Sequence, residues 1–162
     1  MLAFLAACAR DPLLYTATPF VLTIPLGYTA QPAAIADFLQ EHYPSRFQPS
    51  TLLGTAQRLA SSWMQAGYLQ GKKTKRRTHP HVTPIVTAYA LLLGYLSGLR
   101  GARLLDSTWT RLLDCSSAML IEFTTEASKQ GWMRYKAAGA VVEITFPELL
   151  TPAEEQPVYE PN

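Results

Sequence analysis

Residues 49–77 read PSTLLGTAQRLASSWMQAGYLQGKKTKRR, and they predict an amphipathic helix followed by a basic hairpin. Its first part has apolar side chains at intervals of three and four residues, which predicts an amphipathic helix over Pro49–Ala66. Gly67 predicts the end of that helix, because glycine adopts the left-handed conformation of a helix cap at low cost. The predicted buried stripe comprises Leu52, Leu53, Ala56, Leu59, Ala60, Trp63 and Met64.

A short hairpin is expected directly after this helix. Tyr68–Gln70 predicts a first strand, and Thr78–Val82 predicts the return strand. Between them, Gly71–Arg77 is a polar loop that carries five cations. The sequence thus predicts a hairpin with a basic tip.

A second amphipathic helix precedes the first. Pro32–His42 has apolar residues at helical spacing, and the proline at Pro44 predicts its end, because the residue before a proline avoids the helical region. Gly27–Gln31 is expected to be a loop. The order helix, short turn, helix, hairpin follows.

The C-terminal half predicts further helices and a second hairpin. Thr83–Leu96 is a strongly apolar helix, Leu104–Leu113 a short one, and Ser116 or Ser117 caps a helix through Gln130. Trp132–Ala137 and Val141–Phe146 alternate as strands around a turn. All three tryptophans fall on apolar stripes and are expected in the core: Trp63, Trp109 and Trp132.

Two helix exits share one plan. Gln65–Leu69 and Lys129–Met133 each contain glycine, an aromatic residue and an apolar strand start. This echo predicts two similar units in tandem, packed as one compact protein. The alternative is that glycine followed by an aromatic residue is simply a common way to leave a helix.

The composition excludes wholesale disorder. Of 162 residues, 48% are hydrophobic and 16% are charged, whereas disordered chains are poorer in apolar groups and richer in charge. Two cysteines, Cys8 and Cys115, cannot form a disulfide framework, so we expect a reduced, cytoplasmic setting. The apolar run Ile85–Leu96 is too short for a spanning helix of about 20 residues, so no membrane partner is expected.

The charge is unevenly distributed along the chain. Residues 42–105 hold nine lysines and arginines and no acid, although the whole chain has a net charge of only +2. Residues 106–162 hold four bases and nine acids. The middle of the chain is therefore expected to meet an anionic partner, which could be nucleic acid, an anionic surface or an acidic protein.

The order of elements over residues 31–82 resembles a winged helix-turn-helix domain. In that superfamily the second helix enters the major groove of DNA and the hairpin, or wing, contacts the backbone or the minor groove. The resemblance implies DNA contacts from the helix and from the wing, with His79 beside the latter. These residues are Ser50, Thr51, Thr55 and Arg58 on the helix, flanked by Gln57 and Ser61, and Lys72, Lys73, Lys75, Arg76 and Arg77 on the wing.

Elementary chemistry supports the same expectation. Lysine and arginine neutralise phosphates and release counterions, and hydroxyl groups hold phosphates by hydrogen bonds. Arg58 lies in the centre of the polar helix face and is the best candidate to recognise guanine, because its fork of donors can pair with two acceptors.

A narrower resemblance covers about a third of the chain. The segments that carry it are Ser50–Leu52, Leu59–Leu69, Lys75–Arg77, Thr83-Pro84 and Tyr89–Leu91. They resemble the BrxA-type proteins of bacterial BREX phage-defence systems. This similarity implies a helical DNA-binding accessory protein.

Catalytic and cofactor patterns are weak. Gly67–Thr74 lacks the spacing of a phosphate-binding P-loop, since three residues instead of four separate its glycines. His79 and His81 could hold a metal, but a third ligand is not evident nearby. No enzyme activity and no cofactor are therefore expected, and an enzyme using His79 or His81 is the third hypothesis.

The sequence as a whole predicts a mainly α-helical α+β protein in four segments. These are an N-terminal helical segment (1–30), a winged-helix unit (31–103), a helix–helix–hairpin unit (104–150) and a flexible acidic tail (151–162). We expect a non-enzymatic protein that binds double-stranded DNA mostly through phosphates. The alternative is a protein-interaction module, and the acidic C-terminal unit could dock a partner or a second copy.

Overall fold

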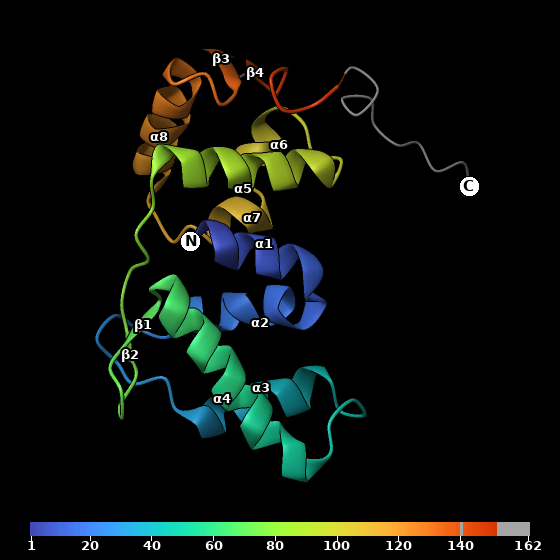
Figure 1. The fold of residues 1–162 in the computed structure, drawn as a ribbon, viewed down its shortest axis with the longest axis vertical. Coiled ribbons are helices and arrows are strands. Elements are labelled where there is room, and N and C mark those ends of the chain that lie inside the picture. Colours follow the sequence, from blue (N-terminus) through green and yellow to red (C-terminus); the bar gives the residue numbers. More distant parts are fainter. Residues whose placement is uncertain (140, 152–162) are drawn as a thin grey trace, which may run out of the picture. The chain divides into compact units, whose positions relative to one another are not determined.

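The computed structural model describes residues 1–139 and 141–151, and the predicted acidic tail lies outside them from residue 152 onward. The described part is mainly helical with two small antiparallel sheets, an α+β architecture (Figure 1). No helix in it combines the length and apolar character needed to cross a bilayer.

Contacts divide the chain into unit 1, Met1–His81, and unit 2, Val82–Asn162. This division differs from the segments predicted at 30/31 and 103/104. Helices α1 (Leu2–Arg10) and α2 (Pro12–Thr23) pack on α4 (Pro49–Ala66), which joins them to the first unit. The apolar helix α5 (Pro84–Leu96) contacts helices that follow it, which joins it to the second.

Unit 1 continues through α3 (Pro32–His42), α4, β1 (Leu69–Gln70) and β2 (Arg76–Arg77). Both predicted amphipathic helices are confirmed, and each begins with proline, whose missing N–H costs nothing at that position. Two residues of the predicted α4 stripe, Leu53 and Met64, are exposed rather than buried.

The hairpin returns earlier than predicted. Strand β2 occupies Arg76–Arg77, whereas Thr78–Val82 was expected to be the return strand. Leu69 pairs with Arg77 and Gln70 with Arg76, so the connecting turn is only Gly71–Lys75. The prediction that the polar loop runs over Gly71–Arg77 is therefore wrong at its end, because two of its five cations, Arg76 and Arg77, belong to a strand.

The segment Gly27–Ala30, predicted as a loop, pairs with β2. Gly27 N donates to Arg77 O (2.9 Å), Arg77 N to Tyr28 O (2.8 Å) and Ala30 N to Lys75 O (2.8 Å). Since β1 occupies the other edge of β2, this segment satisfies the backbone groups that the short hairpin leaves open.

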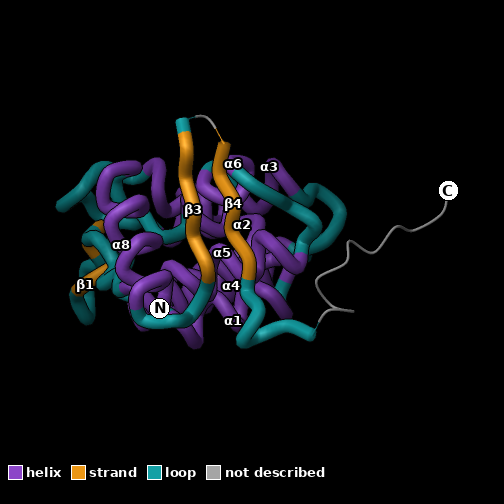
Figure 2. Tube along the Cα trace, turned by 90° about the horizontal axis from the view of Figure 1, so that it is seen from above, coloured by secondary structure: helices purple, strands orange, loops and turns teal. Residues whose placement is uncertain are grey.

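Unit 2 contains α5, α6 (Ala102–Leu105), α7 (Thr108–Arg111), α8 (Ser117–Lys129), β3 (Arg134–Ala138) and β4 (Val141–Thr145). Its core joins α5, α6, α8 and the hairpin through residues such as Leu91, Leu104 and Phe146. The predicted second hairpin is confirmed, with Arg134 opposite Thr145 (Figure 2).

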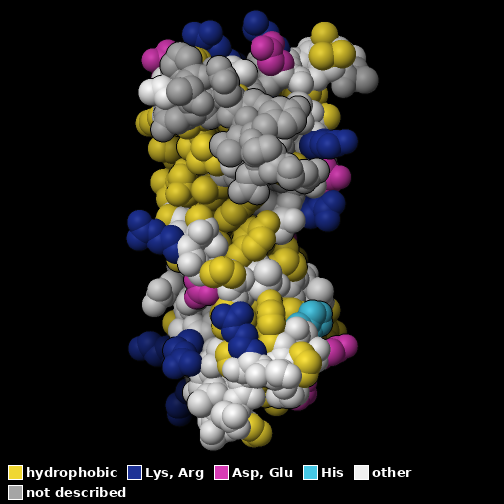
Figure 3. Space-filling model, turned by 90° about the vertical axis from the view of Figure 1, so that its right-hand side faces the viewer, with side chains coloured by type: hydrophobic (Ala, Val, Ile, Leu, Met, Phe, Trp, Pro, Cys, Tyr) yellow, Lys and Arg dark blue, Asp and Glu magenta, His cyan; other side chains and the backbone are white. Residues whose placement is uncertain are grey.

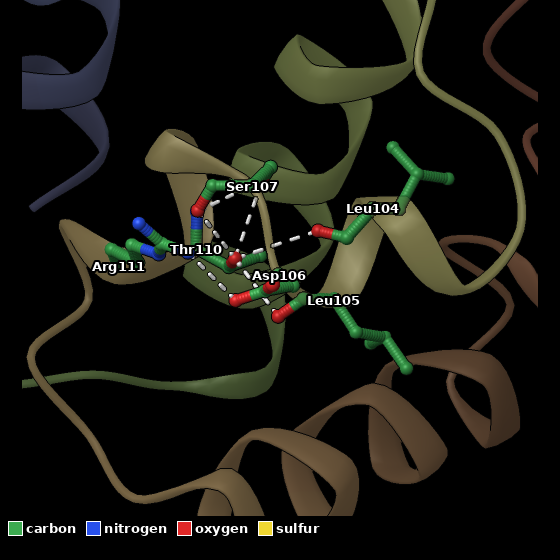
Figure 4. Close-up of polar contacts among 6 residues, drawn as sticks. All are labelled: Leu104, Leu105, Asp106, Ser107, Thr110 and Arg111. Carbon is green, nitrogen blue, oxygen red and sulfur yellow. Dashed lines mark hydrogen bonds and ion pairs between the residues drawn. The ribbon is translucent and has the colours of Figure 1, made fainter.

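The single helix predicted over Leu104–Leu113 is wrong, because a polar junction divides it (Figure 4). Ser107 Oγ accepts from Thr110 N at 3.2 Å and so caps α7. The Thr110 hydroxyl is 3.1 Å from Leu105 O and 2.9 Å from Ser107 O. Serine at a helix start competes with helix continuation, which explains the break.

The two helix exits have the same backbone geometry. Gly67 and Gly131 adopt φ of 93° and 83°, and the next residue donates to the carbonyl five residues back, at 2.9 Å in Tyr68 and 3.1 Å in Trp132. Trp63 and Trp109 are buried as predicted, whereas Trp132 is 39% exposed, which corrects its predicted core position.

Candidate nucleic-acid interface

The polar face of α4 is the first part of the candidate interface. The helix buries Ala56, Leu59 and Trp63, so the residues on its opposite side face solvent. Ser50, Thr51 and Arg58 are exposed there, as the sequence predicted. Gln57 is exposed on the same helix and Ser61 is half-buried.

Thr55 does not belong to this exposed face. Its side chain is buried, and Thr55 Oγ1 donates to Thr51 O at 3.0 Å. Arg58 Nη2 in turn donates to Thr55 Oγ1 at 3.0 Å. The expectation that Thr55 faces outward with the other polar residues is therefore wrong, because it lies at the edge of the apolar stripe, three residues from Leu52 and four from Leu59.

The turn of the β1–β2 hairpin, Gly71–Lys75, is the second part, and we call it the wing turn because the sequence predicts a wing there. Gly71 has φ of 115°, and a Cβ at this position would lie 2.1 Å from Thr74 O, so only glycine fits. Lys72 and Lys73 are exposed at the tip. The turn thus presents cations in a backbone arrangement that the glycine makes possible.

Two further cations tie the wing to its surroundings. Lys75 Nζ donates to Ser61 Oγ at 3.2 Å, which links the turn to α4. Arg76 is exposed, and its Nη1 donates to Gly27 O at 3.0 Å. Both retain donors that can meet an anion, since ammonium and guanidinium groups carry three and five N–H donors.

Arg77 is buried rather than exposed, with 3% of its surface accessible. Its Nε donates to Val21 O at 2.9 Å, its Nη1 donates to the carbonyls of Tyr68 and Thr78, and its guanidinium lies 5.5 Å from the Tyr68 ring centre. The expectation that Arg77 is exposed on the wing is wrong, because strand alternation turns it inward while Arg76 points outward.

A groove of about 470 Å³ lies where these parts meet. Lysines of the wing turn form one side, and α4 and the segment before α3 form the rest. Its lining includes Thr29, Ala30, Gln31, Pro32, Gln57, Ala60, Ser61, Lys72, Lys73, Thr74 and Lys75. We call this hollow the basic groove.

The charge of unit 1 favours an anion in this groove. Residues 1–81 contain eight lysines and arginines and three acids, and the acids Asp11, Asp37 and Glu41 all precede the stretch that carries the groove's lysines. The net charge of these residues is therefore +5, and no carboxylate occurs anywhere in residues 42–81. An incoming anion would meet little repulsion there.

Three polar residues of unit 1 were not among the predicted candidates. Arg46, in the turn between α3 and α4, lies 5.6 Å above the Tyr43 ring and 5.8 Å above the Phe47 ring. Thr29 and Gln31 line the basic groove although they were assigned to a plain loop. The absence of acids from residues 42–105 was a signal for Arg46, whereas nothing local in the sequence pointed to Thr29.

The remaining candidates carry little chemistry. His79 is exposed close to the wing, and His81 is exposed at the end of unit 1. Within residues 1–139 and 141–151, no cluster of three metal-ligating side chains occurs. Burial raises the pKa of the Cys8 thiol to about 12 and also raises the pKa of Cys115, so both thiols are poor nucleophiles at neutral pH.

Comparisons with protein-family models, with curated proteins and with solved structures found no match for this chain.

Proposed function

We propose that unit 1 is a winged helix-turn-helix domain that binds double-stranded DNA, mostly through phosphates. Helices α3 and α4 form the helix-turn-helix and the β1–β2 hairpin is the wing. Hairpin β3–β4 follows α8 in the same manner, so unit 2 is proposed to be a second, winged-helix-like unit. The BrxA resemblance extends the proposal to an accessory role in phage defence, with transcription regulation as the other role open to such a domain.

The bond between Lys75 and Ser61 is the observation that carries the proposal. It joins the wing turn to α4 at 3.2 Å, so the three lysines of the turn and the polar residues Gln57 and Ser61 of the helix border one basic groove. A DNA strand that follows this groove would meet lysines from one side and the hydroxyl and amide groups of α4 from the other.

The contacts proposed here are fewer than those expected from sequence. Phosphates would be neutralised by four cations of the hairpin, which are Lys72, Lys73, Lys75 and Arg76. At the start of α4, phosphates would be held by Ser50 and Thr51. Arg58 would contact the edge of guanine in the major groove. Thr55 and Arg77 are left out because they are buried.

Fluorescence polarisation with a labelled duplex of about 20 base pairs tests this proposal over about 50 to 300 mM salt. If four phosphates are contacted, the log–log slope of affinity against salt should be about −3.6, and it should approach zero in K72A/K73A/K75A/R76A. The matched control is R10A/R103A/R111A/K129A, which removes four exposed cations that lie outside both hairpins. Equal losses in both variants would reject the wing as the contact.

A protein-interaction module is the second candidate, and the exposed apolar side chains of unit 2 favour it. Val141 is 71% exposed and Trp132 39%. Figure 3 shows hydrophobic side chains exposed on one face among charged ones. If duplex DNA fails to bind at about 50 mM salt, an acidic or apolar protein partner becomes the better proposal.

A further inference from the structure

Arg58 is held by a residue that cannot itself reach a ligand. Its Nη2 donates to Thr55 Oγ1 at 3.0 Å, one helical turn before it on α4. Thr55 is 6% exposed, whereas Arg58 is exposed to solvent. The buried Thr55 hydroxyl therefore holds the exposed Arg58 guanidinium by a hydrogen bond.

The Thr55 hydroxyl is oriented to accept this hydrogen bond. Its single proton is used in the bond from Thr55 Oγ1 to Thr51 O at 3.0 Å, which leaves only lone pairs to face outward. Those lone pairs can accept from Arg58 and cannot offer it a competing donor. The two hydrogen bonds therefore run in one direction: the Arg58 guanidinium donates to the Thr55 hydroxyl, which donates to the Thr51 carbonyl.

This arrangement restricts an otherwise flexible side chain. An exposed arginine loses much rotamer freedom when it binds, and holding it in place beforehand reduces that loss. The bond occupies one N–H of the guanidinium, so four N–H donors remain for a partner. Two adjacent donors are enough for the bidentate contact with the O6 and N7 atoms of guanine.

We propose that Thr55 is a positioning residue for sequence recognition, which orients Arg58 toward a guanine in the major groove. This inference rests on the proposed DNA-binding function and adds to it the source of base preference. Affinity that comes from the wing lysines does not depend on Thr55, because they neutralise phosphates as point charges and carry no sequence information.

The test compares Thr55→Val, which keeps a branched side chain and removes the acceptor, with Thr55→Ser, which keeps the hydroxyl. The wild-type full chain first selects its preferred duplex from a random pool. Each guanine in that duplex is then replaced in turn, and affinities are measured by polarisation. Replacement of the guanine that Arg58 contacts should lower the affinity of wild type and Thr55→Ser about tenfold. The same replacement should lower the affinity of Thr55→Val and Arg58→Ala about threefold or less.

A double-mutant cycle separates positioning from a merely structural role. In the Arg58→Ala background, Thr55→Val should have no further effect on base preference. Lys72→Ala is the contrast, since it should lower affinity for every duplex and leave the preference unchanged. Relaxation of the Arg58 side-chain nitrogen in the free protein should show greater mobility in Thr55→Val than in Thr55→Ser.

Three results would overturn the inference. Thr55→Val could keep the full preference, or it could change the preference equally with and without Arg58, or it could leave Arg58 mobility unchanged. If wild type binds DNA normally, any of these results rejects the positioning role of Thr55 and leaves the proposed DNA-binding function standing. If wild type binds no duplex, the DNA-binding function itself is rejected, and the role of Thr55 with it.

Discussion

Trp63 Nε1 donates to Thr18 Oγ1 at 3.2 Å across the core of unit 1, and both residues have no accessible surface. Thr18 Oγ1 is also 2.6 Å from Leu14 O, to which it donates. One hydroxyl thus satisfies the buried indole N–H of α4 and anchors it to α2. Because α4 carries the proposed recognition face, this bond fixes that helix to its support.

Replacement of Trp63 should reveal the two parts of this interaction. Trp63→Ala should cost about 3–5 kcal/mol in the free energy of unfolding, since it leaves a large cavity. Trp63→Phe keeps a smaller aromatic ring and loses the donor, and loss of the hydrogen bond alone should cost about 0.5–1.5 kcal/mol. Urea unfolding measures both values, and a Trp63→Phe variant as stable as wild type would contradict the role of the bond.

Arg77 should behave as a structural residue. Arg77→Ala removes the hydrogen bonds that a charged donor makes to the carbonyls of Val21, Tyr68 and Thr78, and a hydrogen bond to a charged group contributes about 1.5–3 kcal/mol. We therefore expect a melting temperature lower by more than about 10 °C, because about 1 kcal/mol corresponds to about 4–8 °C in a domain of this size. Arg76→Ala is the neighbouring control and should melt as wild type does. An Arg77→Ala variant that melts normally and loses DNA affinity would restore Arg77 to the interface.

The helices are predictable because their apolar spacing is regular, whereas the predictions that fail concern polar side chains at buried positions. Thr55 is four residues before Leu59 and therefore shares its face, but its hydroxyl suggested solvent. Arg77 was placed in the loop because two adjacent arginines look alike, and only strand register distinguishes inward from outward.

Pairing between distant segments could not be inferred at all. Gly27–Ala30 joins β2 through backbone groups, which carry no signal in the side-chain pattern. The link between Lys75 and Ser61 is similar, since it depends on how far the hairpin folds back over α4. The exposure of most candidate residues was thus predictable, whereas the groove that Lys72, Lys73 and Lys75 share with α4 was not.

Thr87 should tolerate, and even favour, an apolar replacement. It is fully buried in α5, and its Oγ1 has no hydrogen-bond partner among the described residues. Thr87→Val removes this unsatisfied group at nearly constant volume and should raise the free energy of unfolding of unit 2 by about 1 kcal/mol. Thermal unfolding followed by circular dichroism measures the change. A loss of stability would show that the hydroxyl has a partner after all, and Thr87→Ala serves as the cavity-forming control.

Cys8 should make stability depend on pH in the alkaline range. Burial raises its pKa to about 12, with Asp11 adding to the effect and a hydrogen bond with Thr18 opposing it. In the unfolded chain the thiol ionises near its ordinary pKa of about 8.5, so above that pH the unfolded state loses a proton that the folded state keeps. The stabilising contribution is therefore complete below about pH 8.5 and is lost as the pH rises toward 12.

The expected loss of stability at high pH can be tested by comparison with Cys8→Ala, which has no thiol to ionise at this position. The variant should be less stable than wild type at pH 7 because it loses packing, and the difference should narrow steadily above about pH 8.5. Thiol labelling provides the second measurement, with Cys115→Ala used to isolate the signal. Cys8 should react with a soluble disulfide reagent only after denaturant is added, since both burial and protonation protect it. Rapid labelling of folded Cys115→Ala at pH 8 would contradict the buried, protonated state of Cys8.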